Sequence, residues 1–476
     1  MVKRILVVFD GSRGDVQPYM VAAKALIMAG YDVMTSGPGD ADALAKHFQV
    51  PFTRSRLSTG KLVADPEMQK AFAVNDMQGM MTAQDRIRDE LVTPETRARD
   101  LGLLYQLLVE WKPDLVLTGF LTFTPIVMMK TEIPVLVLSL QHTRPSRSCS
   151  PMGLTGTPTV LRKCVWYLVM SIMLKSELKN SSKVIAQLTG KPAPKLQVLL
   201  RELYQVWSAN PAFLSIIACS PTLNGDIPAE FNANNVQIGA LMPTPQQQQG
   251  SEFGGEQEKL LEDFLAAGSA PVYFGYGSLI CGSSKFMCLL SLRALKKTGE
   301  RGILVSSWST MSEADILGEP DAEELKAYCA EKVLFMKTAP HGRLFPRCKV
   351  CVHHGGAGTF NSSARSGTPT VITPIIVDQY DHSDLLNQMG FGVGLKMMSK
   401  LKPDDLAGAI QQCIHSESIK EKAKAVAQGM EKEDGQSRLV EVVNDYFESH
   451  IKTGRHAAIK AKLDQQRSGC CACMGS

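Results

Sequence analysis

Short apolar, β-branched runs alternate with helical stretches along most of the chain, and this alternation limits the fold more than any other feature. Residues 3–9 have a strand pattern with the apolar run 5–9, residues 10–16 form a loop with two glycines, 17–30 have a helical pattern, and 31–36 again have a strand pattern. Strand, loop, helix and strand in this order predict a βαβ unit. Pro18 suits a first helical turn and Gly30 a helix end, so we expect the helix over 17–30.

The alternation occurs on both sides of one polar segment. Strand and helix patterns recur at 107–120 and 130–141, and after the segment "PTPQQQQGSEFGGE" (243–256) they restart. That segment is rich in Gln, Gly and Pro, which is typical of a flexible connection. Strands are then expected within 269–279, 300–308, 331–339, 348–356, 367–374 and 391–397. The sequence therefore predicts an α/β protein with two Rossmann-like, doubly wound lobes.

This pattern divides the chain into an N-terminal lobe (1–242), a linker (243–258), a C-terminal lobe (259–435), a helix (436–455) and a basic tail (456–476). Leu439, Val442, Val443 and Phe447 recur at helical spacing, so one face of that helix should be buried. We expect this helix to cross back to the first lobe.

Composition excludes several classes of protein. A net charge of +4 over 476 residues argues against a nucleic-acid-binding surface. The N-terminal apolar run soon meets Asp10, unlike a signal peptide, and the run 164–174 is too short to span a bilayer, so it is expected to be a buried or interfacial helix. Cys348 and Cys351 have no second pair at zinc-ribbon spacing, and free thiols in a cytoplasmic protein are expected.

A glycine-rich turn follows the strand expected within 348–356. The segment "HHGGAGTFNSSARSG" (353–367) predicts a turn at 354–358 and a helix closed by Gly367. Glycines let the backbone approach an anion, and a helix start offers unpaired N–H groups, so the turn suits a phosphate or diphosphate. No Gly-Lys-Ser/Thr follows, and the turn lies late in its lobe, which makes P-loop hydrolysis and NAD binding poor interpretations.

Four motifs in order carry a resemblance to a known family: "GSRGDVQPY", "VYFGYGSL", "PHGRLFPRCKVCVHHGGAGT" and the downstream "DQ". They resemble the glycosyltransferases of the GT-B fold, and within these the sterol 3-beta-glucosyltransferases and the transferases of glycopeptide antibiotics. The resemblance implies two lobes facing a cleft, and an inverting transfer of a hexose, expected to be glucose, from a UDP-sugar to a sterol or other lipid-like hydroxyl.

The resemblance also implies which residues bind the donor. His353 is expected to contact the diphosphate, with His354 in support, while Asp378 and Gln379 bond sugar hydroxyls and Ser278 lies beside the phosphates. The full expected donor set is Ser12, Arg13, Gly14, Ser278, Ala339, His353, Gly355, Gly356, Ala357, Gly358, Thr359, Asp378 and Gln379. A purely structural role is the alternative to donor binding in each case. One of the two histidines would then lie in the core and the other would be exposed at a strand end, and Asp378 would cap a helix.

Transfer requires a base for the acceptor hydroxyl, which the first lobe must supply. Asp15, in the first βα loop, is the expected general base. A helix cap would explain the same acid without chemistry, and Asp10 and His142 are alternative bases. Nothing in the sequence demands a metal or cofactor besides the UDP-sugar, because the acids of "DAD" (40–42) lie at an expected helix start.

The sequence departs from the relatives at positions that concern the nucleotide base and the sugar of the donor. The segment 335–344 lacks the tryptophan that stacks the base in plant-type members, and "YDHSDLL" follows Gln379 where relatives often have aromatic residues. The acceptor is expected between Leu62 and Leu214. Tail residues Cys470, Cys471 and Cys473, with basic neighbours, suggest lipidation and peripheral membrane association, against a plain thiol-bearing tail.

Two further functions remain open on the same motifs. A nucleotide-sugar 2-epimerase would need no acceptor pocket, and a scaffold could bind the donor without catalysis.

Overall fold

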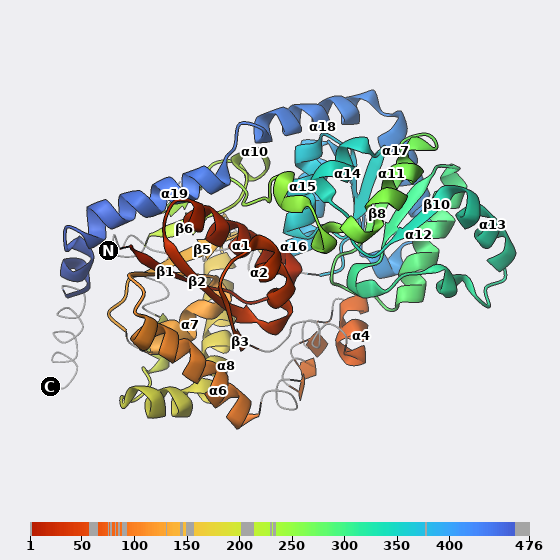
Figure 1. The fold of residues 1–476 in the computed structure, drawn as a ribbon. Helices are drawn as coiled ribbons and strands as arrows, with labels where there is room; N and C mark the ends of the chain where they lie inside the picture. The colour runs from red at the N-terminus through yellow and green to blue at the C-terminus, as the bar shows by residue number, and fades with distance from the viewer. Residues whose placement is uncertain are drawn as a thin grey trace.

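The computed structural model describes residues 2–56, 65–74, 76, 79–80, 82–83, 86–87, 93–129, 131–142, 146–148, 157–200, 214–228, 231, 235–376 and 378–461. Two α/β lobes lie side by side, and the last helices run along one side of both (Figure 1). The tail cysteines and parts of the expected acceptor region, including Leu62, lie outside the described residues.

The first lobe contains a seven-stranded parallel sheet. Its strands are β1 (Arg4–Val8), β2 (Asp32–Pro38), β3 (Phe52–Arg56), β4 (Leu115–Thr118), β5 (Val135–Ser139), β6 (Ser215–Ile217) and β7 (Asn235–Gln237). The strand order is β3-β2-β1-β4-β5-β6-β7, so the order reverses between β1 and β4. The helices are α1 (Arg13–Met28), α2 (Asp42–Phe48), α4 (Pro66–Val74), α6 (Pro94–Gln106), α7 (Phe120–Met128), α8 (Arg162–Thr189) and α10 (Pro221–Asn224).

The second lobe contains a six-stranded parallel sheet in the order β10-β9-β8-β11-β12-β13. Its strands are β8 (Val272–Gly275), β9 (Gly302–Val305), β10 (Val333–Met336), β11 (Val350–His353), β12 (Thr370–Ile372) and β13 (Gly392–Gly394), each within a segment where a strand is predicted. The helices are α11 (Glu258–Ala266), α12 (Ser284–Thr298), α13 (Ala322–Lys332), α14 (His341–Leu344), α15 (Ala357–Ser366), α16 (Asp378–Met389), α17 (Pro403–His415) and α18 (Glu417–Met430). The doubly wound prediction is confirmed for both lobes.

The first helix starts earlier than the sequence predicts. α1 begins at Arg13, so the residues expected to form a loop make its first turn and Pro18 lies inside the helix. Pro18 is the sixth residue of the helix, so α1 lacks the bond that an N–H at this position would make to the Gly14 carbonyl, and the helix continues through it. Proline is therefore a poor marker of the first residue, and the acid Asp15 becomes part of the helix.

The segment predicted to be a flexible connection has a defined structure. It forms three short 3₁₀ turns, Gln246–Gln248, Ser251–Phe253 and Gly255–Gln257. The ring of Phe253 is buried in the core of the first lobe, and Gln248 accepts the backbone N–H of Gly342 in the second lobe at 2.8 Å. A segment poor in apolar residues is fixed here by one buried aromatic ring and by hydrogen bonds, which composition does not reveal.

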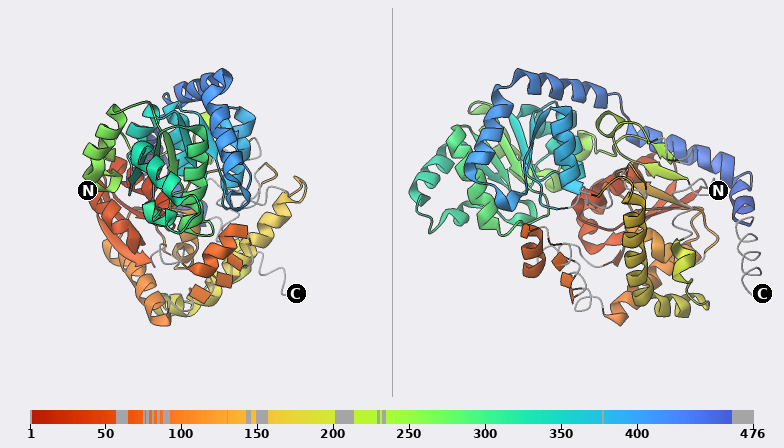
Figure 2. Two further views of the ribbon diagram at one scale, coloured as in Figure 1. Left: turned by 90° about the vertical axis from the view of Figure 1, so that its right-hand side faces the viewer. Right: turned by 180° about the vertical axis from the view of Figure 1, so that it is seen from behind.

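The chain returns to the first lobe through α19 (Gly435–Tyr446), which confirms the expected crossing. α18 packs on the second lobe and α19 on the first, as the blue helices along the upper edge show (Figures 1 and 2). Leu439, Val442, Val443 and Phe447 are all buried among residues of the first lobe. Tyr31 adds a hydrogen bond of 2.5 Å from its hydroxyl to the Asn444 side chain.

The run predicted to be a buried or interfacial helix lies in α8. The helix packs against α6 and α7, with Trp166, Met170 and Leu174 buried. No helix in the described ranges combines enough length and apolar character to cross a membrane.

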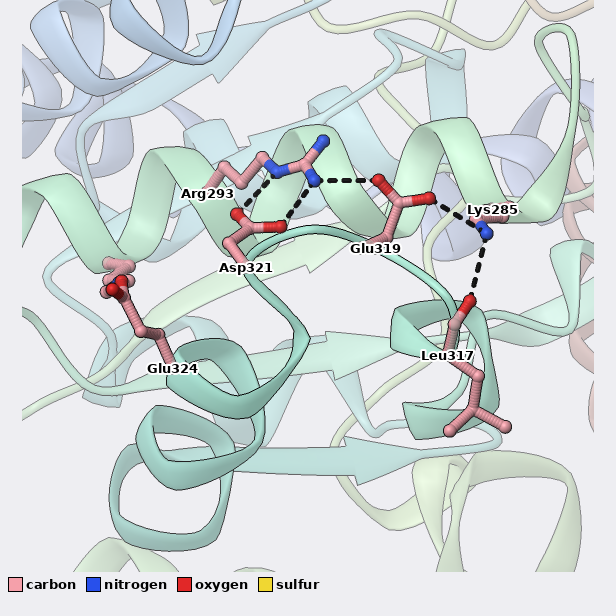
Figure 3. Close-up of polar contacts among 7 residues, drawn as sticks. Lys285, Arg293, Leu317, Glu319, Asp321 and Glu324 are labelled. Atoms are coloured by element: carbon pink, nitrogen blue, oxygen red, sulfur yellow. Dashed lines mark hydrogen bonds and ion pairs between the residues drawn. The ribbon is translucent and has the colours of Figure 1, made fainter.

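A charged network fixes a loop on the outer side of the second lobe. Arg293 on α12 donates to Asp321 at 2.6 Å and to Glu319 at 2.8 Å, and Lys285 donates to the Leu317 carbonyl at 3.1 Å (Figure 3). These contacts lie among residues that do not line the cavity described next, so their role is in the fold.

Candidate active site

A cavity of 490 Å³ lies between the two lobes, at the carboxyl ends of strands from both sheets. It is the region where the strand order of each sheet reverses, which is where open α/β sheets bind ligands. Of the expected site residues, twelve line it: Ser12, Arg13, Gly14, Asp15, Ser278, Ala339, Gly356, Ala357, Gly358, Thr359, Asp378 and Gln379. Residues far apart in the sequence thus meet in one place.

The glycine-rich turn leads from β11 into α15. Gly356 is the N-cap residue, no side chain caps the helix, and the first turn contains no acid. The first amides of α15 therefore keep their hydrogen-bonding capacity and their positive dipole end for a ligand in the cavity. Gly355 has φ of +90°, and a Cβ there would lie 2.8 Å from Ile372, so the turn requires glycine at this position.

The structure places His353 beneath the turn rather than in the cavity wall. The side chain is fully buried, its Nδ1 accepts the Gly355 N–H at 3.0 Å, and its Nε2 lies 3.0 Å from the Ser363 hydroxyl. Because Nδ1 accepts, Nε2 carries the proton and donates to Ser363. Burial holds the pKa of His353 well below 6.5. Both ring nitrogens therefore serve to shape the turn.

His354 is the histidine that lines the cavity. A Cβ at Gly277 would lie 2.7 Å from this ring and one at Gly356 2.4 Å, so the ring occupies space that only glycines leave open. Its Nδ1 is buried without a hydrogen-bond partner in the described part of the chain, and burial lowers its pKa to about 4. The structure therefore places at the cavity the histidine expected in support, His354, and not His353, because β11 ends at His353 and the following turn sets the direction of the next side chain.

Asp15 stands in the opposite wall, at the third position of α1. Its Oδ2 accepts the Ser12 backbone N–H at 2.9 Å and the Ser12 hydroxyl at 3.2 Å, so it does cap the helix. The carboxyl nevertheless lines the cavity and is solvent-accessible there. The protein atoms around it raise its pKa to about 6, the Ser12 bonds oppose the rise, and the charge of Asp378 adds to it. Asp15 therefore both caps α1 and presents a carboxyl group to the cavity.

Asp378 forms a direct link between the lobes. It is the first residue of α16, and its Oδ2 accepts the side-chain N–H of Gln141, which follows β5 in the first lobe, at 2.7 Å. Neighbouring Gln379 is buried, and its Oε1 accepts the backbone N–H groups of Ile375 at 2.8 Å and Ile376 at 3.1 Å. The oxygen of Gln379 therefore fixes the loop, which leaves its amide N–H groups for a ligand.

Arg13 connects the first turn of α1 to the linker. Its guanidinium donates to the Glu252 carboxylate at 2.9 Å and to the Glu252 carbonyl at 2.7 Å, and it lies over the Phe253 ring at 5.2 Å. The charge of Arg13 is thus compensated within the protein. In the described cavity wall, the α15 amides are therefore better placed than Arg13 to bind a diphosphate.

Two alternative bases differ in placement. Asp10 lines the cavity and accepts the Gly11 N–H at 2.9 Å, whereas His142 is not in the wall and packs edge-on against Phe231. The geometry therefore keeps Asp10 as an alternative to Asp15 and gives no support to His142.

Several wall residues escape sequence reasoning. In the sequence, Gln141 stands out only as a polar residue that follows a strand. His341 lies in the segment 335–344, whose one informative feature in the sequence is the absence of a tryptophan. His341 stacks on Phe345 at 4.5 Å and lies 3.0 Å from the Tyr273 hydroxyl. Burial lowers its pKa to about 3, so it lines the cavity as a neutral ring.

No group of three or more His, Cys, Asp or Glu side chains within the described ranges is arranged to hold a metal ion. Asp40 and Asp42 lie at the start of helical turns, where acids are ordinary. Transfer without a metal stays a prediction.

Two Rossmann-like lobes, a site between their strand ends and a last helix that crosses back define the GT-B fold of glycosyltransferases. Solved structures agree with this fold. The calicheamicin glycosyltransferase CalG4 has a TM-score of 0.61 at 14% identity, with 94% of this chain and 99% of that chain covered. The kitacinnamycin glycotransferase has a TM-score of 0.60 at 16% identity, with 93% and 98% covered.

The family match falls on the second lobe. Residues 316–446 match the family of the erythromycin biosynthesis protein CIII-like C-terminal domain. The sterol 3-beta-glucosyltransferase of Yarrowia lipolytica is 32% identical over 200 residues, which is 41% of this chain and 13% of that protein. The sterol 3-beta-glucosyltransferase of Arabidopsis thaliana is 31% identical over 202 residues, 42% of this chain and 30% of that protein. The chain thus matches less than a third of the length of these relatives.

Proposed function

We propose that this chain is an inverting glycosyltransferase that moves a hexose, expected to be glucose, from a UDP-sugar to the hydroxyl of a sterol or similar lipid. The observation that carries the proposal is the placement of Asp15, with its pKa raised to about 6, across one cavity from the uncapped start of α15. A candidate general base, Asp15, thus faces a helix start that suits a diphosphate. The names of the sterol 3-beta-glucosyltransferases similar to this chain support the donor sugar and the acceptor class.

In this reaction Asp15 takes the proton of the acceptor hydroxyl as its oxygen attacks the anomeric carbon. The bond from that carbon to the donor phosphate breaks, and the nucleotide diphosphate leaves with the electron pair. Amides at the start of α15 and the His354 ring stabilise the charge that develops on the leaving group. Attack from the face opposite the leaving group inverts the anomeric configuration.

Asp378 and Gln379 lie on the second-lobe side of the cavity, next to the turn. A carboxylate oxygen and an amide N–H suit sugar hydroxyls, which both donate and accept hydrogen bonds. A nucleotide base would then extend toward Ala339 and His341, which line the same cavity. The donor is thereby assigned to the second lobe and the acceptor to the first.

The test is transfer from radiolabelled UDP-glucose to a sterol dispersed in detergent, with wild-type protein and Asp15→Asn. We expect a glycosylated sterol with wild-type protein and a loss of at least a hundredfold with the variant, the lower end for a general base. Donor binding, followed by calorimetry, should be retained in the variant.

Two results would contradict the proposal. Epimerised donor in the absence of acceptor would indicate a 2-epimerase. Donor binding with no product that depends on Asp15, across a panel of UDP-sugars and lipid extracts, would indicate a non-catalytic binding protein.

A further inference from the structure

The first half of α8 exposes a cluster of large apolar side chains. Tyr167, Leu168 and Ile172 are 53%, 59% and 43% exposed, and Val160 and Leu161 just before the helix are 73% and 50% exposed. Of the twelve large apolar side chains that are exposed in the described part of the chain, these five lie within thirteen consecutive residues. Scattered exposed apolar side chains are ordinary in proteins, whereas a contiguous group marks a binding surface.

The same face of the helix becomes basic further along. Lys175, Lys179 and Lys183 follow at intervals of four residues, are exposed, and form no ion pair with the described residues. The opposite face of α8 is packed, with Trp166 and Met170 in the core. The helix therefore presents one continuous outer strip, apolar at its start and positively charged toward its end.

We propose that the outer strip of α8, formed by Tyr167, Leu168, Ile172, Lys175, Lys179 and Lys183, docks the protein on an anionic phospholipid surface. Exposed Tyr, Leu and Ile side chains insert at the boundary between headgroups and acyl chains, and lysines on the same face bind lipid phosphates. The combination of both kinds of side chain on one face favours a charged bilayer over a protein partner, whose interface core would be depleted of lysine. This inference concerns binding and does not depend on the proposed reaction, although a lipid acceptor would give it a use.

The experiment is vesicle co-sedimentation of the full-length, unacylated protein without donor or acceptor. One set of vesicles is phosphatidylcholine alone and the other contains phosphatidylserine as well. We expect binding to the anionic vesicles to be the stronger and to weaken with salt. The variant Lys175→Glu/Lys179→Glu should bind anionic vesicles at least twentyfold more weakly, since each lysine near a membrane surface contributes about fivefold. Leu168→Ser/Ile172→Ser should weaken binding to both kinds of vesicle.

Matched controls keep the result interpretable. Lys259→Glu/Leu260→Ser alters an exposed lysine and an exposed leucine on α11 of the other lobe and should bind vesicles as wild type does. Replacing Cys470, Cys471 and Cys473 by serine should leave the binding of unacylated protein unchanged. The α8 variants alter surface side chains, so circular dichroism and thermal unfolding should match wild type.

Three outcomes would overturn the inference. The first is vesicle binding that the α8 variants leave unchanged. The second is binding that the cysteine replacements abolish. The third is concentration-dependent self-association of the wild-type protein, lost in Leu168→Ser/Ile172→Ser, which would make the strip an interface between two copies of the chain. A failure of sugar transfer by wild-type protein would bear on the proposed function alone.

Discussion

Gln141 of the first lobe donates a hydrogen bond of 2.7 Å to the Asp378 carboxylate of the second lobe. The bond joins the end of β5 to the start of α16 across the cavity, and it leaves the other oxygen of Asp378 open to a ligand. Gln141 therefore orients an acid that sequence reasoning assigned to the donor sugar.

We predict that Gln141→Leu weakens donor binding about tenfold, because a hydrogen bond to a charged group contributes about 1.5–3 kcal/mol. The measurement is the Kd for UDP-glucose by calorimetry. The same substitution should change the Kd for UDP much less, since UDP has no sugar for Asp378 to bind. Equal losses for both ligands would show that Gln141 acts on the lobes as a whole.

Asp15→Asn should lower kcat by about 10²–10⁴ with little change in donor Kd, because it removes a base and keeps the shape of the side chain. Asp10→Asn is the matched control from the same cavity wall. If the larger loss in kcat occurs in Asp10→Asn, the base is Asp10.

The pH dependence of transfer follows from the pKa of Asp15, which is raised to about 6. A base must be ionised, so kcat/KM should rise with pH through about 6 and level off above it. Ser12→Ala removes a bond that lowers this pKa, so the rising limb should move to higher pH. Asp378→Asn removes a charge that raises it, so the limb should move to lower pH. Profiles for both variants that coincide with wild type would assign the limb to another group.

Substitution of the two adjacent histidines should have different effects, one on thermal stability and the other on donor binding. His353→Ala should lower Tm strongly, because it empties a buried space and leaves Ser363 and the Gly355 N–H without their partner. His354→Ala should leave Tm nearly unchanged and weaken donor binding. Thermal unfolding and donor titration of both variants measure this, and a strong Tm loss in His354→Ala with none in His353→Ala would contradict the structure.

Acid should destabilise the protein through its buried histidines. The pKa values of His341, His353 and His354 all lie below 6.5 in the folded chain because of burial. The unfolded chain then binds more protons than the folded one below pH 6.5, so the free energy of unfolding should fall as pH falls through that value. Urea unfolding at a series of pH values tests this. His341→Phe, which keeps a ring in the stack on Phe345, should reduce the pH slope.

The sequence by itself determined the two lobes, all six strands of the second sheet and twelve residues of the cavity wall. Those features are local: apolar runs of strand length, glycine at a sharp turn, and acids directly after strands. The same local logic placed the start of α1 too late, because Pro18 suits a first helical turn and yet lies inside the helix in the structure.

Only the tertiary structure decided which histidine faces the cavity, because the path of the turn after the end of β11 sets where each of the two side chains lies. It also decided the pairing of Gln141 with Asp378, which lie 237 positions apart in the sequence, and the ordering of the linker by the buried ring of Phe253. The bond between Gln141 and Asp378 depends on how the two lobes face one another, and no spacing within either lobe encodes that arrangement.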